Sequence, residues 1–168
     1  MDYICRYFSP LGSITVASDG TALTGLWFEG QKYFASTLNP EHEERSLSVF
    51  DKAITWLDVY FRGMDPGPPP PLAPMGSPFR EAVWEVLLTV PYGHTVTYGY
   101  IAKVLSENNS RRRTSARAVG NAVGHNPLSL FIPCHRVVGA GGRLTGYAGG
   151  PDRKRQLLLL ENALPPTL

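Results

Sequence analysis

β-Branched and aromatic residues recur through the first 30 residues of the chain, and turn-forming residues divide this stretch into short runs. The breaks fall at Pro10-Leu11-Gly12 and at Asp19-Gly20. Runs of this composition between turn signals are typical of strands that pair with their sequence neighbours. The pattern therefore predicts a small antiparallel sheet at the start of the chain.

The hydrophobic spacing then changes to a helical period. Apolar residues recur three or four positions apart, as on one face of a helix: Phe50, Ala53, Ile54, Leu57 and Phe61. Ser48 and Asp51 fit a capping pair at the start of this helix, and Arg62-Gly63 fits a stop at its end. We expect one helix to follow the sheet.

Residues 64–78 read MDPGPPPPLAPMGSP and contain seven prolines. Proline lacks a backbone donor and favours extended polyproline conformation, so this stretch cannot continue a helix or a sheet ladder. We interpret it as a semi-rigid linker between an N-terminal α/β domain at residues 1–63 and a C-terminal domain at residues 79–168.

Helical spacing returns after the linker. A helix is expected from Ser77-Pro78 to Pro91-Tyr92-Gly93, with Val83, Val86, Leu87 and Val90 on its apolar stripe. A second should run from Thr97 or Tyr98 to Leu105, and a third should begin at Thr114 or Ser115 and carry ARAVGNAVG. Two short helices across a tight turn suggest a helix-turn-helix, which presents its second helix to DNA, although ordinary packing of two helices is the simpler alternative.

Charge supports contact with a polyanion. Residues 1–78 hold five Lys/Arg against nine Asp/Glu, whereas residues 79–168 hold eleven against five, so the halves carry about −4 and +6 within a net charge of +2. A basic half on a nearly neutral protein is typical of nucleic-acid binding. The candidate phosphate contacts are Arg111, Arg112 and Arg113 in the turn and Ser115 at the start of the third helix. Arg117 is the one long side chain on an otherwise small-residue helix, and it has the shape for insertion into a base stack.

The 168 residues contain no apolar run long enough for a membrane span, and the N-terminus does not resemble a signal peptide. We expect a cytoplasmic protein, or a nuclear one in a eukaryote, with no membrane partner. The two cysteines, Cys5 and Cys134, should then stay reduced.

The stretch FIPCHRVVGA at residues 131–140 carries the candidate chemistry. If a buried strand leads to Pro133, the proline ends its pairing and holds Cys134 rigidly near the strand end. Thiolate is the reactive form of cysteine, and His135 is the candidate base, acting through a bridging water because neighbours on an extended chain point apart. Glu161, in the expected last helix RKRQLLLLENA at residues 153–163, is a candidate for orienting the imidazole by residue type alone. A buried structural cysteine is the alternative.

These patterns together predict an α+β fold. A small N-terminal antiparallel sheet with a helix should precede a mostly helical C-terminal domain, which contains the helix-turn-helix and a short strand that carries the reactive cysteine.

IPCHRVV, with TVTYG and ARAVGNAVGHNP before it and GYAGG after it, resembles the signature of the O6-alkylguanine-DNA alkyltransferases, the methylated-DNA-protein-cysteine methyltransferases. The similarity in order and spacing extends from about Phe79 to Glu161. It implies a protein that flips alkylated guanine out of double-stranded DNA and moves the O6-alkyl group irreversibly onto its own cysteine. It also implies binding through the minor groove, action as a monomer, activity on O4-alkylthymine as well, and no cofactor.

The resemblance also assigns roles to residues. Cys134 matches the alkyl acceptor, His135 the water-relaying base and Glu161 the carboxylate that orients it. Arg117 matches the arginine finger that fills the gap in the base stack. Tyr98 matches the tyrosine that contacts guanine and the adjacent phosphate, and Asn126 matches the asparagine that braces the recognition helix against the cysteine segment. Val137 and Ala148 match positions whose backbone groups bind guanine. The active-site loop is matched by Tyr147, Ala148, Gly149 and Gly150.

The chain departs from the family pattern in some places. Some members bind zinc in the first domain, but here only Cys5 and His42 are available there, so we expect no metal. The pocket wall reads Asn126-Pro127-Leu128-Ser129, which leaves tolerance of bulky adducts open. Two other functions are alternatives: a Cys134-His135-Glu161 hydrolase, and a DNA-binding lesion sensor or regulator with a reactive cysteine.

Overall fold

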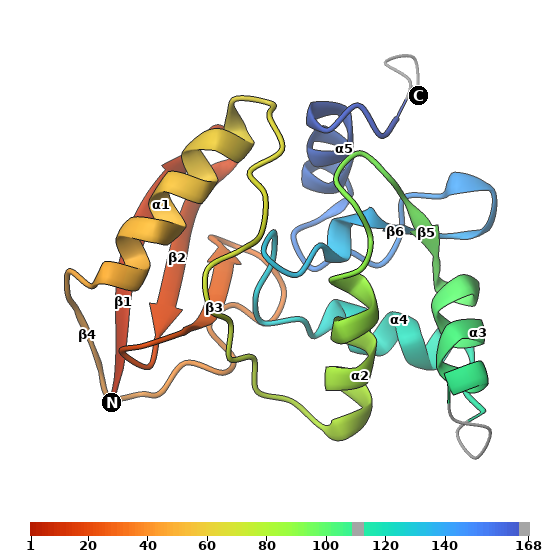
Figure 1. Ribbon diagram of the computed structural model, residues 1–168, viewed down its shortest axis with the longest axis horizontal. Coiled ribbons are helices and arrows are strands. Elements are labelled where there is room, and N and C mark those ends of the chain that lie inside the picture. Colours follow the sequence, from red (N-terminus) through yellow and green to blue (C-terminus); the bar gives the residue numbers. More distant parts are fainter. Residues whose placement is uncertain (109–112, 165–168) are drawn as a thin grey trace. The chain divides into compact units, whose positions relative to one another are not determined.

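A computed structural model describes residues 1–108 and 113–164 of the chain. It contains two compact units. The first comprises Met1–Met75 together with Pro127–Phe131, and the second comprises Gly76–Asn126 together with the residues from Ile132 onward. The α+β class predicted from the sequence is confirmed (Figure 1).

The first unit is built on a four-stranded sheet with the order β3-β2-β1-β4. The strands are β1 (Asp2–Ser9), β2 (Gly12–Ser18), β3 (Leu23–Phe28) and β4 (His42–Glu44). The first three pair antiparallel through the two turns seen in the sequence, whereas β4 pairs parallel to β1. This last strand, three exposed residues long, was not anticipated.

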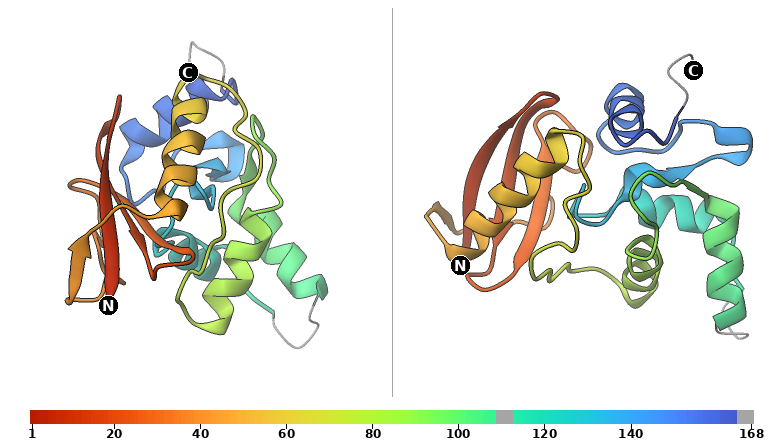
Figure 2. Two further views of the ribbon diagram at one scale, coloured as in Figure 1. Left: turned by 60° about the vertical axis from the view of Figure 1, so that its left-hand side comes forward. Right: turned by 45° about the horizontal axis from the view of Figure 1, so that its top comes forward.

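Helix α1 (Ser48–Phe61) covers one face of this sheet, as the two views of Figure 2 show. Its buried face includes Phe50, Ala53 and Leu57, as the helical spacing predicted. The predicted capping pair is wrong, because Leu47 takes the extended cap conformation and Ser48 is already the first helical residue. The predicted end is confirmed, since Gly63 adopts a positive φ of 79° directly after the cap residue Arg62.

The proline-rich stretch is held along the edge of the first unit. The N–H of Leu23 donates to the carbonyl of Pro71 at 2.8 Å, and the N–H of Ala73 donates back to the carbonyl of Leu23 at 2.7 Å. The indole of Trp56 donates to the carbonyl of Gly67 at 3.0 Å. Prolines here accept hydrogen bonds but donate none, so the stretch adds an isolated bridge to β3 rather than a further strand.

Residues 127–131 also pack in the first unit, although they follow α4 in the chain. The N–H of Leu26 in β3 donates to the carbonyl of Pro127 at 2.8 Å, and the Phe131 ring lies 4.7 Å from the Trp56 ring. Leu128, Leu130 and Phe131 are buried. The chain therefore makes a five-residue excursion into the first unit before it returns to the second unit with the segment that contains Cys134.

The second unit is mostly helical. Its elements are α2 (Pro78–Leu87), β5 (Val96–Thr97), α3 (Tyr98–Asn108), α4 (Ala116–Gly124), the 3-10 turn η1 (Cys134–Arg136), β6 (Val137–Val138), the 3-10 turn η2 (Ala140–Gly142) and α5 (Pro151–Leu160). Ser77 caps α2 and Ser115 caps α4, each through its side-chain oxygen. Helix α4 packs on α2 and α3, and the indole of Trp84 donates to the carbonyl of Ala122 at 2.9 Å.

The cysteine lies in a 3-10 turn, not in the predicted strand. Pro133 precedes it with φ −80° and ψ 66°, and the N–H of Arg136 closes the turn on the carbonyl of Pro133 at 3.0 Å. Because Pro133 cannot donate to a ladder, strand pairing resumes only in β6, where Val137 pairs with Val96 of β5. The strand therefore follows the cysteine.

Across residues 1–108 and 113–164, no helix is long and apolar enough to cross a membrane.

Candidate active site

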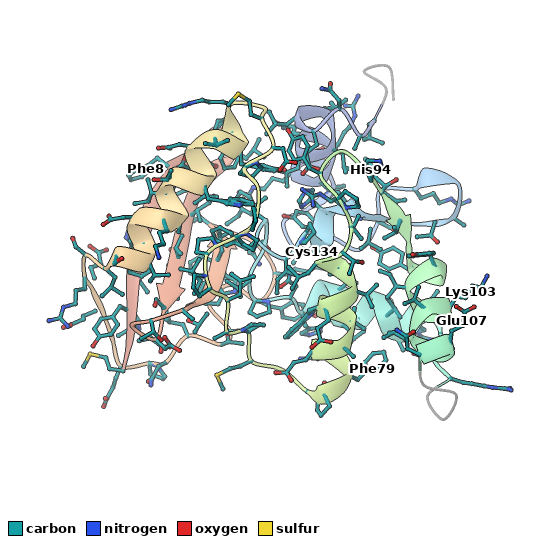
Figure 3. The ribbon with its side chains drawn as sticks, viewed as in Figure 1. Phe8, Phe79, His94, Lys103, Glu107 and Cys134 are labelled. Atoms are coloured by element: carbon teal, nitrogen blue, oxygen red, sulfur yellow. The ribbon has the colours of Figure 1, made fainter. Side chains whose placement is uncertain are left out.

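Cys134 opens the turn η1 and is 3% exposed (Figure 3). Its N–H donates to the carbonyl of Ile132 at 2.8 Å, which fixes the backbone on the entry side. Successive side chains of a 3-10 turn are rotated by about 120° around its axis. The side chains of Cys134 and His135 therefore point apart, as expected, although the backbone here forms a turn and not an extended strand.

His135 and Glu161 form a buried pair. Nε2 of His135 lies 2.5 Å from Oε2 of Glu161, and both side chains are fully buried. Burial lowers the pKa of His135 and outweighs the opposing carboxylate of Glu161. Burial alone would raise the pKa of Glu161, but the hydrogen bonds and charges of His135 and Arg136 hold it well below its usual range. The ionised carboxylate accepts from Nε2–H, so in the neutral imidazole the basic nitrogen is Nδ1.

Glu161 is the C-cap residue of α5, one position beyond the helix in which the sequence analysis placed it. Its second oxygen, Oε1, accepts from Nε of Arg136 at 2.8 Å and from the N–H of Gly93 at 3.0 Å. The guanidinium also donates from Nη1 to the carbonyl of Val90 at 2.9 Å. The carboxylate that orients His135 is therefore held from three sides.

Tyr98 lies at the N-terminus of α3, and its hydroxyl donates to the carbonyl of Thr145 at 2.6 Å. Lys154 of α5 is fully buried, donates to the same carbonyl at 2.7 Å and lies 3.5 Å from the Tyr98 oxygen. Burial raises the pKa of Tyr98 to about 12, with a further rise from Cys134 and an opposing effect of the Thr145 bond. Burial lowers the pKa of Lys154 to about 8, against an opposing effect of Cys134. Both groups therefore lie close enough to Cys134 to interact with a thiolate at that position.

The loop before α5 lies beside these groups. Tyr147 is buried, and its ring centroid is 6.5 Å from that of His135. A Cβ on Gly149 would come within 2.5 Å of the Tyr147 ring, and one on Gly146 would come within 2.7 Å of the Tyr98 oxygen. Glycine is thus needed at both positions for the loop to approach this closely. Ala148 is half-buried, and Val137 in β6 is fully buried.

Asn126 lies at the point where the chain leaves the second unit. Its Nδ2 donates to the carbonyl of Ile132 at 2.8 Å, and the side chain is buried. This single bond joins the residue before the excursion to the residue after it. Asn126 thereby ties the end of α4 to the segment that leads to Cys134.

The candidate DNA contacts lie on a different set of elements. Arg117 and Ser115 are exposed at the start of α4 and line a shallow groove of about 510 Å³ with Arg80 of α2. Arg113 is exposed as well, whereas Arg111 and Arg112 fall outside the described residues. The structure thus brings Cys134, His135, Glu161, Tyr98 and the Tyr147–Gly149 loop together and leaves Arg117 on the surface of α4.

Sequence reasoning missed Arg136, Gly93 and Lys154 as members of the site. A signal existed for the lysine, because Lys154, Leu157, Leu158 and Glu161 follow the spacing of one helix face and all four are buried. Nothing comparable marks Arg136 or Gly93, whose roles depend on a contact with a residue far along the chain.

Outside this site, the described residues contain no group of three or more His, Cys, Asp or Glu side chains placed to hold a metal ion. Cys5 is half-buried, and burial together with Asp51 and Glu44 raises its pKa to about 11.

Residues 78–163 match the family described as 6-O-methylguanine DNA methyltransferase, DNA binding domain, and residues 3–66 match the 6-O-methylguanine DNA methyltransferase, ribonuclease-like domain. The chain belongs to this family. The resemblance carried by IPCHRVV and its flanking motifs is thereby confirmed.

The similarity to individual 6-O-methylguanine DNA methyltransferases covers nearly the whole chain. The methylated-DNA–protein-cysteine methyltransferase of Mycobacterium tuberculosis H37Rv is 42% identical over 158 residues, which is 94% of this chain and 91% of that protein. The protein of the same name from Methanosarcina acetivorans is 40% identical over 162 residues, covering 96% and 99%. The crystal structure of Mycobacterium tuberculosis OGT in complex with DNA superposes with a TM-score of 0.83 at 39% identity, covering 96% of this chain and 93% of that one.

Proposed function

We propose that this protein repairs O6-alkylguanine in double-stranded DNA by irreversible, stoichiometric transfer of the alkyl group to Cys134. One observation carries the proposal: in a chain of this family, a buried cysteine is followed by a histidine whose imidazole is held by an ionised carboxylate. O4-alkylthymine is a second substrate under the same proposal. The protein acts as a monomer.

In the proposed reaction, the thiol proton of Cys134 passes through a water molecule to Nδ1 of His135. Glu161 stabilises the imidazolium that forms, because its Oε2 already accepts from Nε2 at 2.5 Å. The sulfur then forms a bond to the alkyl carbon while the bond from that carbon to O6 breaks. The electron pair of the broken bond stays with guanine, so a donor has to stabilise the leaving anion.

Tyr98 supplies this donor in our proposal. A phenol with a pKa near 12 stays protonated and can donate a hydrogen bond to the guanine anion. Its hydroxyl is now bonded to the carbonyl of Thr145, which Lys154 also satisfies at 2.7 Å. Tyr98 can therefore turn toward a base while the Thr145 carbonyl keeps Lys154 as a donor. Backbone groups of Val137 and Ala148, with the loop of Tyr147 and Gly149, hold the guanine edge.

The DNA partner is proposed to lie along α4, with this small-residue helix in the minor groove. Arg117 is exposed at the first turn of α4 and fills the gap that the flipped nucleotide leaves. Arg113 and Ser115 contact phosphates, together with Arg111 and Arg112. Binding that relies on phosphates and on a small-residue face is nearly independent of sequence, as a repair protein requires.

The test is a titration of the protein with a duplex that contains one O6-methylguanine, followed by mass spectrometry of the intact protein and of its peptides. We expect a gain of one methyl group, about 14 Da, on the Cys134 peptide that saturates at one per molecule. Cys134→Ser is the matched control, and it should bind the same duplex without any gain in mass.

Other outcomes would assign the alternatives. Loss of the lesion with repeated turnover and an unmodified cysteine would indicate a hydrolase, and binding of the lesion without loss of the methyl group would indicate a sensor. Either result would contradict the proposal.

A further inference from the structure

Arg136 is a buried cation to which the proposed reaction gives no task. Its side chain is 9% exposed and makes three contacts in the second unit. Nε binds Glu161, Nη1 binds the carbonyl of Val90, and the guanidinium lies 5.7 Å from the centre of the Tyr92 ring. Burying a cation is costly unless its partners hold it well, so this arrangement calls for a reason.

The contacts of Glu161 divide its two oxygens between different partners. Oε1 accepts from Arg136 Nε at 2.8 Å and from the N–H of Gly93 at 3.0 Å. Oε2 accepts from His135 at 2.5 Å. A carboxylate can rotate and exchange its oxygens, but here two donors occupy one of them. Oε2 is left facing the imidazole.

One donor on Oε1, the N–H of Gly93, comes from a turn that is itself fixed. Val90 and Gly93 lie in the segment after α2, and Gly93 has a φ of 80°, which favours glycine. A Cβ on Gly93 would lie 3.2 Å from the main-chain oxygen of Glu161. We call Val90, Tyr92, Gly93 and Arg136 the carboxylate cradle. It connects the turn after α2, the cysteine turn η1 and the end of α5.

We propose that the cradle, and Arg136 above all, positions Glu161 for alkyl transfer. The donors of the cradle hold Oε1, so that Oε2 faces His135. The positive charge of Arg136 offsets the carboxylate charge, so that His135 stays a neutral proton acceptor. The inference rests on the proposed function, because it assigns a device for the same thiol–imidazole pair. Arg136 acts through Glu161 and is a positioning residue, not a catalytic one.

The charges around His135 give the direction of the effect. Glu161 favours the imidazolium, whereas Arg136 on η1 and Lys154 on α5 disfavour it, and Cys134 and the Tyr147 ring complete the surroundings. Removing the positive charge of Arg136 leaves Lys154 as the weaker opposition to Glu161, so the pKa of His135 rises. In the proposed reaction the thiol proton of Cys134 passes to His135, so His135 has to lose its own proton before it can act, and it then does so at higher pH. Activity should therefore fall off at a higher pH on the acid side.

The experiment compares Arg136→Met, Arg136→Lys and the unchanged protein, all carrying Cys5→Ser so that Cys134 is the one remaining thiol. Single-turnover repair of an O6-methylguanine duplex and alkylation of Cys134 by iodoacetamide are each followed from pH 5 to 9. For Arg136→Met we expect the acid limb of both profiles to move up by about one pH unit and the plateau rate of repair to fall at least about tenfold.

Arg136→Lys separates charge from geometry. Lysine keeps the charge but cannot bind Glu161 and Val90 with a planar fork, so the acid limb should stay in place while the plateau falls about two- to fivefold. Arg62→Met removes one exposed positive charge from the first unit and is the matched control, for which both profiles should remain unchanged. An acid limb that stays in place or moves down in Arg136→Met overturns the proposal.

Two further measurements keep the outcome clear. If Arg136→Met does not fold, the NMR chemical shifts of the His135 ring nitrogens in the unchanged protein test the proposal. The proposal requires a neutral, Nε2-protonated ring at pH 7, and an imidazolium at that pH overturns it. The iodoacetamide profile needs no DNA. If the unchanged protein fails to repair the duplex, the proposed function fails, while the thiol profile still tests whether Arg136 controls the Cys134–His135 pair.

Discussion

Arg117 is the residue whose role is most open to a direct test, because it is exposed and lies apart from the reacting groups. We predict that Arg117→Ala slows repair of a duplex at least about tenfold but leaves reaction with free O6-methylguanine base unchanged, since a free base needs no flipping. The measurement is the rate constant for methylation of Cys134 by each substrate.

Arg80→Ala is the matched control for this prediction. Arg80 lines the same groove as Arg117 but belongs to α2. It should weaken duplex binding only modestly, as expected for one phosphate contact. An equal effect of Arg117→Ala on both substrates would remove the finger role from this residue.

Individual site residues could be nominated from the sequence where residue type alone carried the information. A cysteine next to a histidine, with a carboxylate in the last helix, was enough to nominate Cys134, His135 and Glu161 as one group, and the His135–Glu161 contact exists at 2.5 Å. Arg136 could not be found in this way. Its task depends on which carboxylate oxygen it meets, and only the folded chain determines that.

At the scale of elements, the local rules worked best for helices and failed where two rules competed. Ser115 and Ser77 cap their helices as expected, but at α1 the cap position falls on Leu47. A hydrophobic residue there is tolerated because Val49 and Phe50, two and three positions after it, are buried. Likewise, the apolar run around Cys134 looks like a strand, yet Pro133 forces a turn first. At α1 tertiary packing outweighed a local preference, whereas at Cys134 the local constraint of proline outweighed the strand preference of the apolar run.

Ser48, which was expected to cap α1 and does not, provides the control for a prediction about α4. We predict that Ser115→Ala lowers the free energy of unfolding by about 1 kcal/mol, because the N–H of Ala118 loses its acceptor at 3.1 Å. Ser48→Ala removes a serine at the equivalent sequence signal without removing a cap, so its effect should be near zero. Urea unfolding of the two variants measures both, and equal losses would contradict the assignment of the caps.

At the scale of the whole molecule, residues 127–131 matter most, because the chain returns to its first unit just before the catalytic turn. We predict that a fragment of residues 76–168 aggregates or lacks a cooperative unfolding transition, since Leu128, Leu130 and Phe131 lose the partners that bury them. Light scattering and thermal unfolding of the fragment and of the full chain check this.

Replacing the three apolar residues by serine in the same fragment should restore solubility. A fragment that is soluble and cooperative without those changes would show that the excursion is dispensable. The sequence contained no sign of this excursion, because its residues read as an ordinary apolar approach to the cysteine. Pairing partners about a hundred positions apart cannot be inferred from local composition.

The excursion also has a consequence for the order in which the protein is made. The outer edge of β3 is covered partly by the backbone around Leu72 and partly by the backbone around Leu128. During translation at roughly 5–20 residues per second, the segment around Leu128 is made about 5–20 s after Leu26 itself. For that time the nascent sheet presents an unpaired edge at Leu26, the kind of surface on which chains associate. Newly made protein should depend on ribosome speed and on chaperones more than refolded protein does.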